Sequence, residues 1–232
     1  MKKHLFIGTF NFENKTLIIK DKELANQIKN VLRFKVSDII FLGNGQSTEA
    51  KTEILEIKKD EVVVKILNTE TNENEYAKDV TLYLAILKRE NFELVIQKAT
   101  EIGIKQIVPV LSERTVKTGL KIERLEKIIK EASEQSGRGI LPIITEPMKF
   151  KDALAHAQNN QINLFFHLDG ENLNKIRLTQ NKIGLFIGPE GGWSDPEVAE
   201  IKKSDTFTKV SLGKLTLRGE TAAIVACYLG LQ

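Results

Sequence analysis

The segment KIGLFIGPEGGWSDPEV, Lys182–Val198, contains the pattern that decides the fold. Its apolar run Ile183–Ile187 predicts a buried strand, and the residues from Pro196 onward predict a helix. Ser194 and Glu197 match the S-x-x-E capping box found at helix starts, and Pro196 fits the first helical turn. A strand that passes through a glycine-rich turn directly into a helix is the repeating unit of α/β proteins.

The same alternation extends outward from this segment over most of the chain. Further apolar strands are predicted at residues 80–87, 107–111, 162–168 and 207–213. Apolar residues at helical spacing form three more groups, namely Phe92, Val95, Ile96, Ala99 and Ile102, then Ile122, Leu125, Ile128, Ile129 and Ala132, and finally residues 220–229. Gly137 fits the C-terminal cap of the second of these helices. We therefore predict an α/β domain with a mainly parallel sheet and helices on both faces.

The N-terminal third of the chain has a different pattern. Short strand-like segments lie at residues 4–8, 38–45, 53–59 and 61–67, and turns at 43–45 and 58–60 would join antiparallel neighbours. One helix is predicted from the apolar residues Leu24, Ile28, Val31 and Leu32. The polar segment Asn68–Asp79 has the composition of a linker. We expect a small β-rich domain at residues 1–70, a linker at 71–79, and the α/β domain at 80–232.

Composition narrows the class of protein. The 232 residues are 41% hydrophobic, and the net charge of +3 permits a basic patch without requiring a nucleic-acid partner. The single cysteine, Cys227, lies in an apolar run, so we expect a core residue, no disulfide and a reducing compartment.

Because neither a signal peptide nor a bilayer-spanning apolar stretch is present, a soluble cytoplasmic protein is expected. The three histidines are scattered, so no metal site is expected.

Two glycine-containing loops form the candidate ligand site. The first, Gly188–Gly192, is more flexible than a helix cap requires and lets a ligand approach the backbone closely. The second lies in VSLGKLTLRGETAA, Val210–Ala223, where a short strand again meets a loop and then a helix. Such loops gather at the carboxyl ends of parallel strands, so these two would form two walls of one pocket. Neither loop matches the dinucleotide or Walker-type phosphate-binding motifs.

Several basic residues have two interpretations. Arg138, in EASEQSGRGILP, fits a solvated charge after a helix, and Arg218 fits a surface ion pair with Glu220. Another basic set follows two predicted strand ends and consists of Lys88, Arg89, Arg114 and Lys117. These side chains are either scattered surface charge or the basic rim that an RNA backbone would need.

Taken together, these stretches resemble one family. QKATEIGI, SERT, EASEQSGR, IGPEGGWSDPE and LGKLTLRGETA occur here in the order typical of the RsmE-type 16S rRNA uracil-N3 methyltransferases of the SPOUT superfamily. VLRFKVSD followed by LGNG resembles the PUA-like RNA-binding barrel of the same family. Two departures are present. Gly219 stands where the family often has threonine or valine, and Gln27 and Lys29 lie in a helix where a histidine is common.

The resemblance implies an S-adenosylmethionine-dependent enzyme that methylates a uridine of 16S rRNA, within the small ribosomal subunit. It also implies a homodimer and a C-terminal trefoil knot at about residues 183–231. The implied cofactor-binding residues are Ile187, Gly188, Pro189, Gly191, Gly192, Leu212, Gly213, Leu217 and Arg218. The residues expected to bind RNA are Lys2, Lys3, Arg33, Lys88, Arg89, Arg114 and Arg138.

The candidate catalytic residues follow from what this reaction needs. Uracil N3 must be aligned with the methyl group and lose its proton, and the charge on the flanking carbonyl oxygens must be stabilised. We expect Arg138 first and Arg218 second to stabilise that charge, and Glu190 is a candidate proton acceptor. A carboxylate inside the glycine-rich loop would repel a phosphate but is compatible with a cationic sulfonium. The methyl carbon of a sulfonium is already electrophilic, so no metal is needed.

Two alternatives remain open from the sequence. One is another SPOUT methyltransferase that acts on tRNA or on a different base, although the paired EQSGR and GPEGG motifs argue against it. The other is a non-catalytic RNA-binding protein with two basic-rimmed domains. Such a binder would have no need for two adjoining glycine loops.

Overall fold

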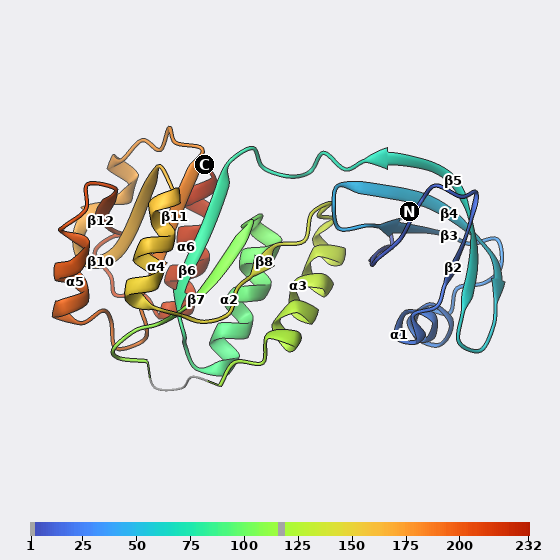
Figure 1. The fold of residues 1–232 in the computed structure, drawn as a ribbon, viewed down its shortest axis with the longest axis horizontal. Helices are drawn as coiled ribbons and strands as arrows, with labels where there is room; N and C mark the ends of the chain where they lie inside the picture. The colour runs from blue at the N-terminus through green and yellow to red at the C-terminus, as the bar shows by residue number, and fades with distance from the viewer. Residues whose placement is uncertain (1–2, 116–118) are drawn as a thin grey trace. The chain divides into compact units, whose positions relative to one another are not determined.

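The computed structural model describes residues 3–115 and 119–232, and its chain forms two compact units (Figure 1). The first unit comprises the residues up to Glu75 together with Ser133–Leu141. The second comprises Tyr76–Ala132 and Pro142–Gln232. The segment Ser133–Leu141, which the sequence assigns to the α/β domain, therefore belongs to the first unit.

The first unit is built on a five-stranded sheet with the strand order β1-β3-β4-β5-β2. Its strands are β1 (Leu5–Ile7), β2 (Thr16–Ile19), β3 (Ile39–Gly43), β4 (Thr48–Ile57) and β5 (Val62–Thr71). β1 pairs with β3 in parallel, and the other pairs are antiparallel. The predicted turns at 43–45 and 58–60 join β3 to β4 and β4 to β5, as expected, whereas β2 was not predicted.

Part of the predicted linker is a strand. Residues 68–71 continue β5 and pair with residues 48–51 of β4. Their side chains are polar and exposed, so the composition matches a linker. Because backbone groups alone form the ladder, exposed polar side chains do not prevent pairing.

The helix of the first unit differs from the prediction at its end. Leu24 and Ile28 are buried as expected, but Val31 is 65% exposed and Leu32 is 38% exposed. The α-helix α1 spans only Lys22–Asn26, and Gln27–Val31 forms a π-helical turn in which the N–H of Leu32 donates to the carbonyl of Gln27. A π-helical turn contains more residues than the 3.6 of an α-helical turn. Val31 and Leu32 are therefore rotated away from the core.

The second unit contains a parallel sheet with the order β12-β10-β11-β6-β7-β8, and β9 also pairs with β7. Its strands are β6 (Asp79–Ala85), β7 (Gln106–Leu111), β8 (Ile143–Ile144), β9 (Met148–Lys149), β10 (Ile162–Asn172), β11 (Lys182–Ile187) and β12 (Phe207–Ser211). Every described pairing in this sheet is parallel. The predicted parallel α/β sheet is therefore confirmed, and only the two-residue strands β8 and β9 were not predicted.

Helices cover both faces of this sheet (Figure 1). The helices of this part of the chain are α2 (Arg89–Ile102), α3 (Ile122–Ser136), α4 (Phe150–His156), α5 (Asp195–Ile201) and α6 (Gly219–Leu231). Successive side chains of a strand point to opposite faces. Leu185 lies under Gly230 of α6, and the next residue, Phe186, packs in an aromatic core with Phe165, α4 and α5. Of these helices, only α4 was not predicted.

Two local predictions are confirmed by the described residues. Helix α3 ends at Ser136, and Gly137 follows with a φ of +76°, the left-handed conformation that favours glycine at a helix end. Cys227 is fully buried in α6, and burial raises the pKa of its thiol. The expected trefoil knot stays a prediction.

Among the described residues, no helix has the length and apolarity needed to cross a bilayer. The same residues contain no group of three His, Cys, Asp or Glu side chains arranged to hold a metal ion.

Candidate functional site

A cavity of about 700 Å³ lies in the second unit, at the carboxyl ends of four neighbouring strands. Those strands are β12, β10, β11 and β6, which are adjacent in the sheet. The lining consists of Lys88 and Asn91 after β6, Phe166–Leu168 in β10, Ile187–Trp193 after β11, and Ser211–Gly213, Leu215–Glu220 and Ala222 after β12. This position is where open parallel sheets bind ligands, since the loops of neighbouring strands converge there.

The glycine-rich loop after β11 forms the first wall of the cavity. The N–H of Gly192 donates to the carbonyl of Pro189 at 2.8 Å, and Gly192 has a φ of +69° that other residues rarely adopt. A side chain at Gly188 would lie 3.1 Å from the indole nitrogen of Trp193. The Trp193 ring is buried and stacks on Phe165, with the ring centres 4.9 Å apart. The loop is thus shaped by its own backbone and by the core beneath it.

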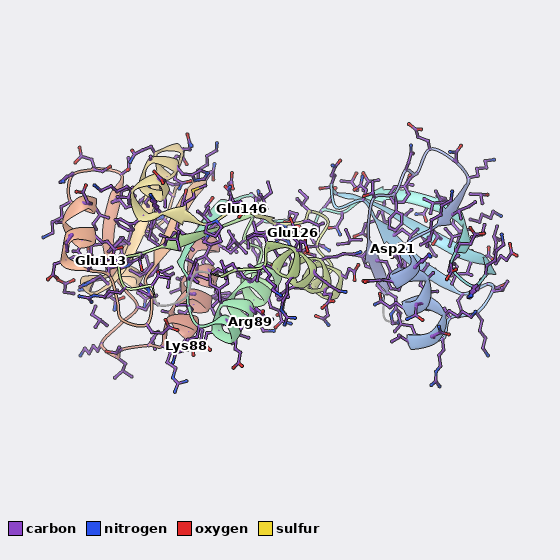
Figure 2. The ribbon with its side chains drawn as sticks, turned by 60° about the horizontal axis from the view of Figure 1, so that its bottom comes forward. Asp21, Lys88, Arg89, Glu113, Glu126 and Glu146 are labelled. Atoms are coloured by element: carbon purple, nitrogen blue, oxygen red, sulfur yellow. The ribbon has the colours of Figure 1, made fainter. Side chains whose placement is uncertain are left out.

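Contacts with neighbouring strand ends hold this loop. Oε1 of Glu190 accepts a hydrogen bond from the N–H of Lys88 at 3.0 Å, and Nη1 of Arg114 donates to the carbonyl of Gly191 at 2.7 Å. Figure 2 shows Lys88 beside Arg89 at the start of α2. The loop is therefore fastened to the segments that follow β6 and β7.

The predicted capping box is present at the end of the loop. Ser194 caps α5, and its N–H donates to Oε2 of Glu197 at 2.8 Å. The other oxygen of the Glu197 carboxylate accepts from the N–H of Glu113, after β7, at 2.9 Å. Glu197 is buried, so its two backbone donors offset the cost of removing its charge from water.

The loop between β12 and α6 forms the second wall. Gly213 has a φ of +131°, and Arg218 is the N-cap residue of α6. The Arg218 side chain is 86% exposed, and its Nη1 lies 3.9 Å from Oε1 of Glu220. A Cβ atom at Gly219 would lie 3.1 Å from Cδ2 of Leu87, so the glycine gives a close approach between this helix start and the segment after β6.

The nine predicted cofactor-binding residues all line the cavity, as does Glu190. The structure thus brings both glycine loops together, as the parallel-sheet argument predicts. It also adds His167 and Leu168, which sequence reasoning missed. Their signal in the sequence was the HLDG stretch at the end of a predicted strand, where polar residues and a glycine interrupt an apolar run.

Three of the predicted RNA-binding residues lie near this edge of the sheet. Lys88 lines the cavity, and Arg114 contacts the glycine-rich loop. Arg89 follows Lys88, and its Nε donates to Oε1 of Glu93 at 2.9 Å. Lys117 and Lys2 lie outside the described residues.

Arg138 lies in the first unit, in a buried ion pair. Its Nε and Nη2 donate to the two carboxylate oxygens of Glu75 at 3.1 and 2.7 Å. The side chains are only 6% and 12% exposed, and Glu75 also accepts from the N–H of Ile140 at 3.2 Å. The solvated charge considered from the sequence is therefore wrong, because a carboxylate 63 residues away in the chain covers Arg138. Arg138 is not among the described residues that line the cavity.

The other predicted RNA-binding residues of the first unit differ in their surroundings. The ammonium group of Lys3 pairs with the buried Glu49 and lies 5.0 Å from the centre of the Phe41 ring. Arg33 is exposed and has a φ of +58°. Arg33 thus presents its charge to solvent, whereas the Lys3 charge is paired.

The charges in the cavity indicate what it can hold. Its described lining has two cationic side chains, Lys88 and Arg218, and two carboxylates, Glu190 and Glu220. Backbone amides and carbonyls of the two loops supply the remaining polar groups. The cations and carboxylates of this lining balance, so the site suits a nucleoside-sized ligand without the large negative charge of a triphosphate.

Two family models match this chain. One, described as an RNA methyltransferase domain, matches residues 74–230. The other, described as an RNA methyltransferase PUA domain, matches residues 19–67.

Relatives and solved structures agree with these matches. The ribosomal RNA small subunit methyltransferase E of Rickettsia conorii is 32% identical to this chain, and the aligned region covers 96% of this chain and 92% of that protein. The protein of the same name from Mesomycoplasma hyopneumoniae is 39% identical, and the aligned region covers 72% of this chain and 73% of that protein. A crystal structure of ribosomal RNA small subunit methyltransferase E from Neisseria gonorrhoeae, bound to S-adenosyl methionine, has a TM-score of 0.91 at 28% identity, covering 97% and 95%. A Legionella pneumophila protein solved with the bound cofactor SAM has a TM-score of 0.90 at 28% identity, covering 98% and 96%.

Proposed function

This chain belongs to the family of ribosomal RNA small subunit methyltransferases E, and from that membership we infer its reaction. It transfers a methyl group from S-adenosylmethionine to N3 of a uracil base in 16S rRNA. The observation that carries this conclusion is a cavity formed by the two glycine loops, in a fold shared with a relative solved with that cofactor.

The residues of the cavity fit this cofactor. Ile187, Gly188, Pro189, Gly191 and Gly192 would hold it from one side, and Leu212, Gly213, Leu217 and Arg218 from the other. Backbone donors and acceptors at these positions suit an adenine ring, and the glycines admit close approach. The bound cofactor supplies an electrophilic methyl carbon. The carboxylates of Glu190 and Glu220 favour its sulfonium and ammonium charges.

The protein must bring the uracil base to this cavity. N3 lies on the Watson–Crick edge, so the target base is unpaired or displaced from its helix during the reaction. The exposed guanidinium of Arg218 lies at the cavity and is a suitable donor to the carbonyl oxygens beside N3, which become more negative as N3 loses its proton. Lys88, Arg89 and Arg114 lie at the same edge of the sheet and would bind the RNA backbone.

The role of Arg138 in stabilising the charge on the uracil carbonyl oxygens stays a prediction. Its ion pair with Glu75 gives the side chain a structural function in the first unit. Kinetics of Arg138→Ala, with cofactor affinity and thermal stability measured separately, distinguish the two roles. Unchanged turnover in folded protein would remove Arg138 from the mechanism.

The first unit is proposed to bind rRNA through Arg33, Lys2 and Lys3, in keeping with the PUA family model that matches it. The structure describes Lys3 and Arg33, which are both exposed, and it pairs the charge of Lys3 with Glu49. Binding of this kind is mainly electrostatic and falls as salt concentration rises.

We also propose a homodimer, supported by α6. This helix is apolar on almost all sides, and one face packs on β11 and β6. The outward residue Tyr228 is 55% exposed, which leaves apolar surface for a second copy of the chain. Sedimentation should then give about twice the 26.2 kDa of one chain.

Methyl transfer to purified small ribosomal subunits tests the proposed function. With labelled S-adenosylmethionine, label should appear in 16S rRNA as N3-methyluridine. Label in tRNA or on another base would favour the other SPOUT activity. A protein without saturable S-adenosylmethionine binding in calorimetry would instead be an RNA-binding protein. Naked 16S rRNA, assayed in parallel, shows whether the enzyme needs the assembled particle.

A further inference from the structure

The strand β10 is interrupted at the cavity by a bulge. Its parallel register with β12 runs as far as Phe166, which lies opposite Val210, and resumes with Glu171 opposite the same Val210. Residues 167–170 are therefore extra on the β10 side. A Cβ atom at Gly170 would lie 2.4 Å from the backbone of Val210, so only glycine fits there. Bulges of this kind redirect side chains, and here the bulge places His167 in the cavity lining.

A carboxylate and a lysine orient the His167 ring. Nδ1 of His167 is hydrogen-bonded to Oδ1 of Asp169, and Nζ of Lys209, on β12, donates to Oδ2 of Asp169 at 2.9 Å. The bond from Lys209, and then that from His167, holds the pKa of the Asp169 carboxyl at about 2. Asp169 is thus ionised at neutral pH and accepts a hydrogen bond from the Nδ1–H group. In the neutral ring, Nε2 is then the acceptor nitrogen.

The other titratable groups of the described cavity lining are Lys88, Glu190, Arg218 and Glu220. Lysine and arginine carry protons and are poor acceptors at neutral pH. Glu190 is bonded to the backbone of Lys88, and Glu220 lies beside Arg218. His167 is the imidazole in this set, and imidazole is the side chain most used as a general base near neutral pH.

We propose that His167 accepts the N3 proton of uracil, oriented for this by Asp169 and Lys209. The proposal rests on the proposed function. The proton passes from N3 to Nε2 of His167 while N3 bonds to the methyl carbon, and the sulfur keeps the electron pair of the broken S–C bond. The imidazolium that forms is stabilised by Asp169 and then releases its proton to water.

The variant His167→Asn tests the proposal, because its amide keeps a donor for Asp169 but has no basic nitrogen. General-base help contributes about 10²- to 10⁴-fold, so the single-turnover rate at saturating cofactor and ribosomal subunits should fall by about a hundredfold or more. The pH–rate profile of the wild type should have an acid limb, and this limb should disappear in the variant. In calorimetry, affinity for S-adenosylmethionine should stay within about threefold, because the variant removes no loop contact.

Asp169→Asn provides a second variant with a readout independent of turnover. Because the ammonium of Lys209 needs an acceptor, the amide oxygen of Asn should face Lys209, and its NH2 group then donates to Nδ1, so the ring carries its proton on Nε2. Nitrogen NMR of the protein without cofactor should show this change of tautomer, and the rate should fall by about tenfold or more. His4→Asn, in the first unit, controls for the loss of an imidazole elsewhere and should leave the pH–rate profile unchanged.

Two results would overturn the proposal. In the first, His167→Asn keeps the wild-type rate and acid limb. In the second, it loses affinity for S-adenosylmethionine and regains the full rate at saturating cofactor, which would make His167 a cofactor-binding residue only. Failure of the proposed function looks different, since the wild-type enzyme itself would then leave uracil N3 unmethylated.

Discussion

At the scale of single residues, the carboxylate of Glu190 makes a hydrogen bond that holds the glycine-rich loop. It accepts from the N–H of Lys88, the N-cap residue of α2, whose own side chain makes no capping bond. An anion at a helix N-terminus is favoured by the free N–H groups and by the helix dipole. Glu190 therefore joins the glycine-rich loop to the start of α2.

This contact predicts different effects for two substitutions. Glu190→Gln keeps an oxygen acceptor for the Lys88 N–H but loses the charge that favours the cationic cofactor, so it should preserve turnover and weaken cofactor affinity by no more than about threefold. Glu190→Ala removes a bond worth about 1.5 kcal/mol and should weaken S-adenosylmethionine binding by about tenfold. Calorimetry and single-turnover kinetics of both variants decide the matter. If the glutamine variant loses turnover while still binding cofactor, Glu190 is a proton acceptor after all.

At the scale of elements, an ion triad joins α2 to α3. Arg124, at the start of α3, donates to both carboxylate oxygens of Glu93 at 2.6 and 2.8 Å, and Arg89 donates to one of them at 2.9 Å. The hydrogen bond from Arg124, followed by that from Arg89, lowers the pKa of Glu93 to about 2, although desolvation opposes the shift. Arg89 therefore has a structural role in this triad, in addition to its proposed contact with RNA.

The lowered pKa predicts a pH-dependent contribution to stability. A carboxyl whose pKa is lower in the folded state stabilises the fold above its unfolded pKa, and the effect disappears as pH falls towards the folded value. The Tm of the wild type should exceed that of Glu93→Gln above about pH 5, and the difference should shrink as pH approaches about 2. Glu126→Gln, an exposed carboxylate on α3, is the control. A difference that does not change with pH would show that the triad contributes nothing through charge.

At the scale of the whole molecule, two units with separate cores imply separate tasks. The cavity residues all belong to the second unit, and the PUA family model matches the first. Substitutions of exposed charges in the first unit should therefore change RNA affinity and leave cofactor affinity unchanged.

Arg33→Gln tests this division of tasks. The variant removes an exposed charge of the first unit, so it should weaken rRNA binding and reduce the slope of log affinity against log salt by about one. Calorimetric affinity for S-adenosylmethionine should be unchanged. Lys175→Gln, which removes an exposed charge of the second unit, serves as the matched control. Weaker cofactor binding with unchanged RNA binding in Arg33→Gln would contradict the division.

Features that depend on near neighbours in the chain could be predicted from the sequence. The alternation of strands and helices, the Ser194–Glu197 capping box, the glycine stop at Gly137 and the two glycine loops were all predicted and are present. Each depends on periodicity or on hydrogen bonds within a few residues, so the local pattern is sufficient. The family motifs also predict nine cofactor-binding residues, and all nine line the cavity.

Features that depend on contacts between distant segments could not be predicted in this way. Arg138 is paired because the fold brings Glu75, 63 residues earlier in the chain, into contact with it. His167 lines the cavity because β12 lies beside β10, where the register shifts and Gly170 lies against Val210. The π-helical turn after Asn26 is likewise invisible to a fixed helical period. Strand neighbours and ion-pair partners are set by packing between segments far apart in the sequence, and periodicity carries no information about such pairs.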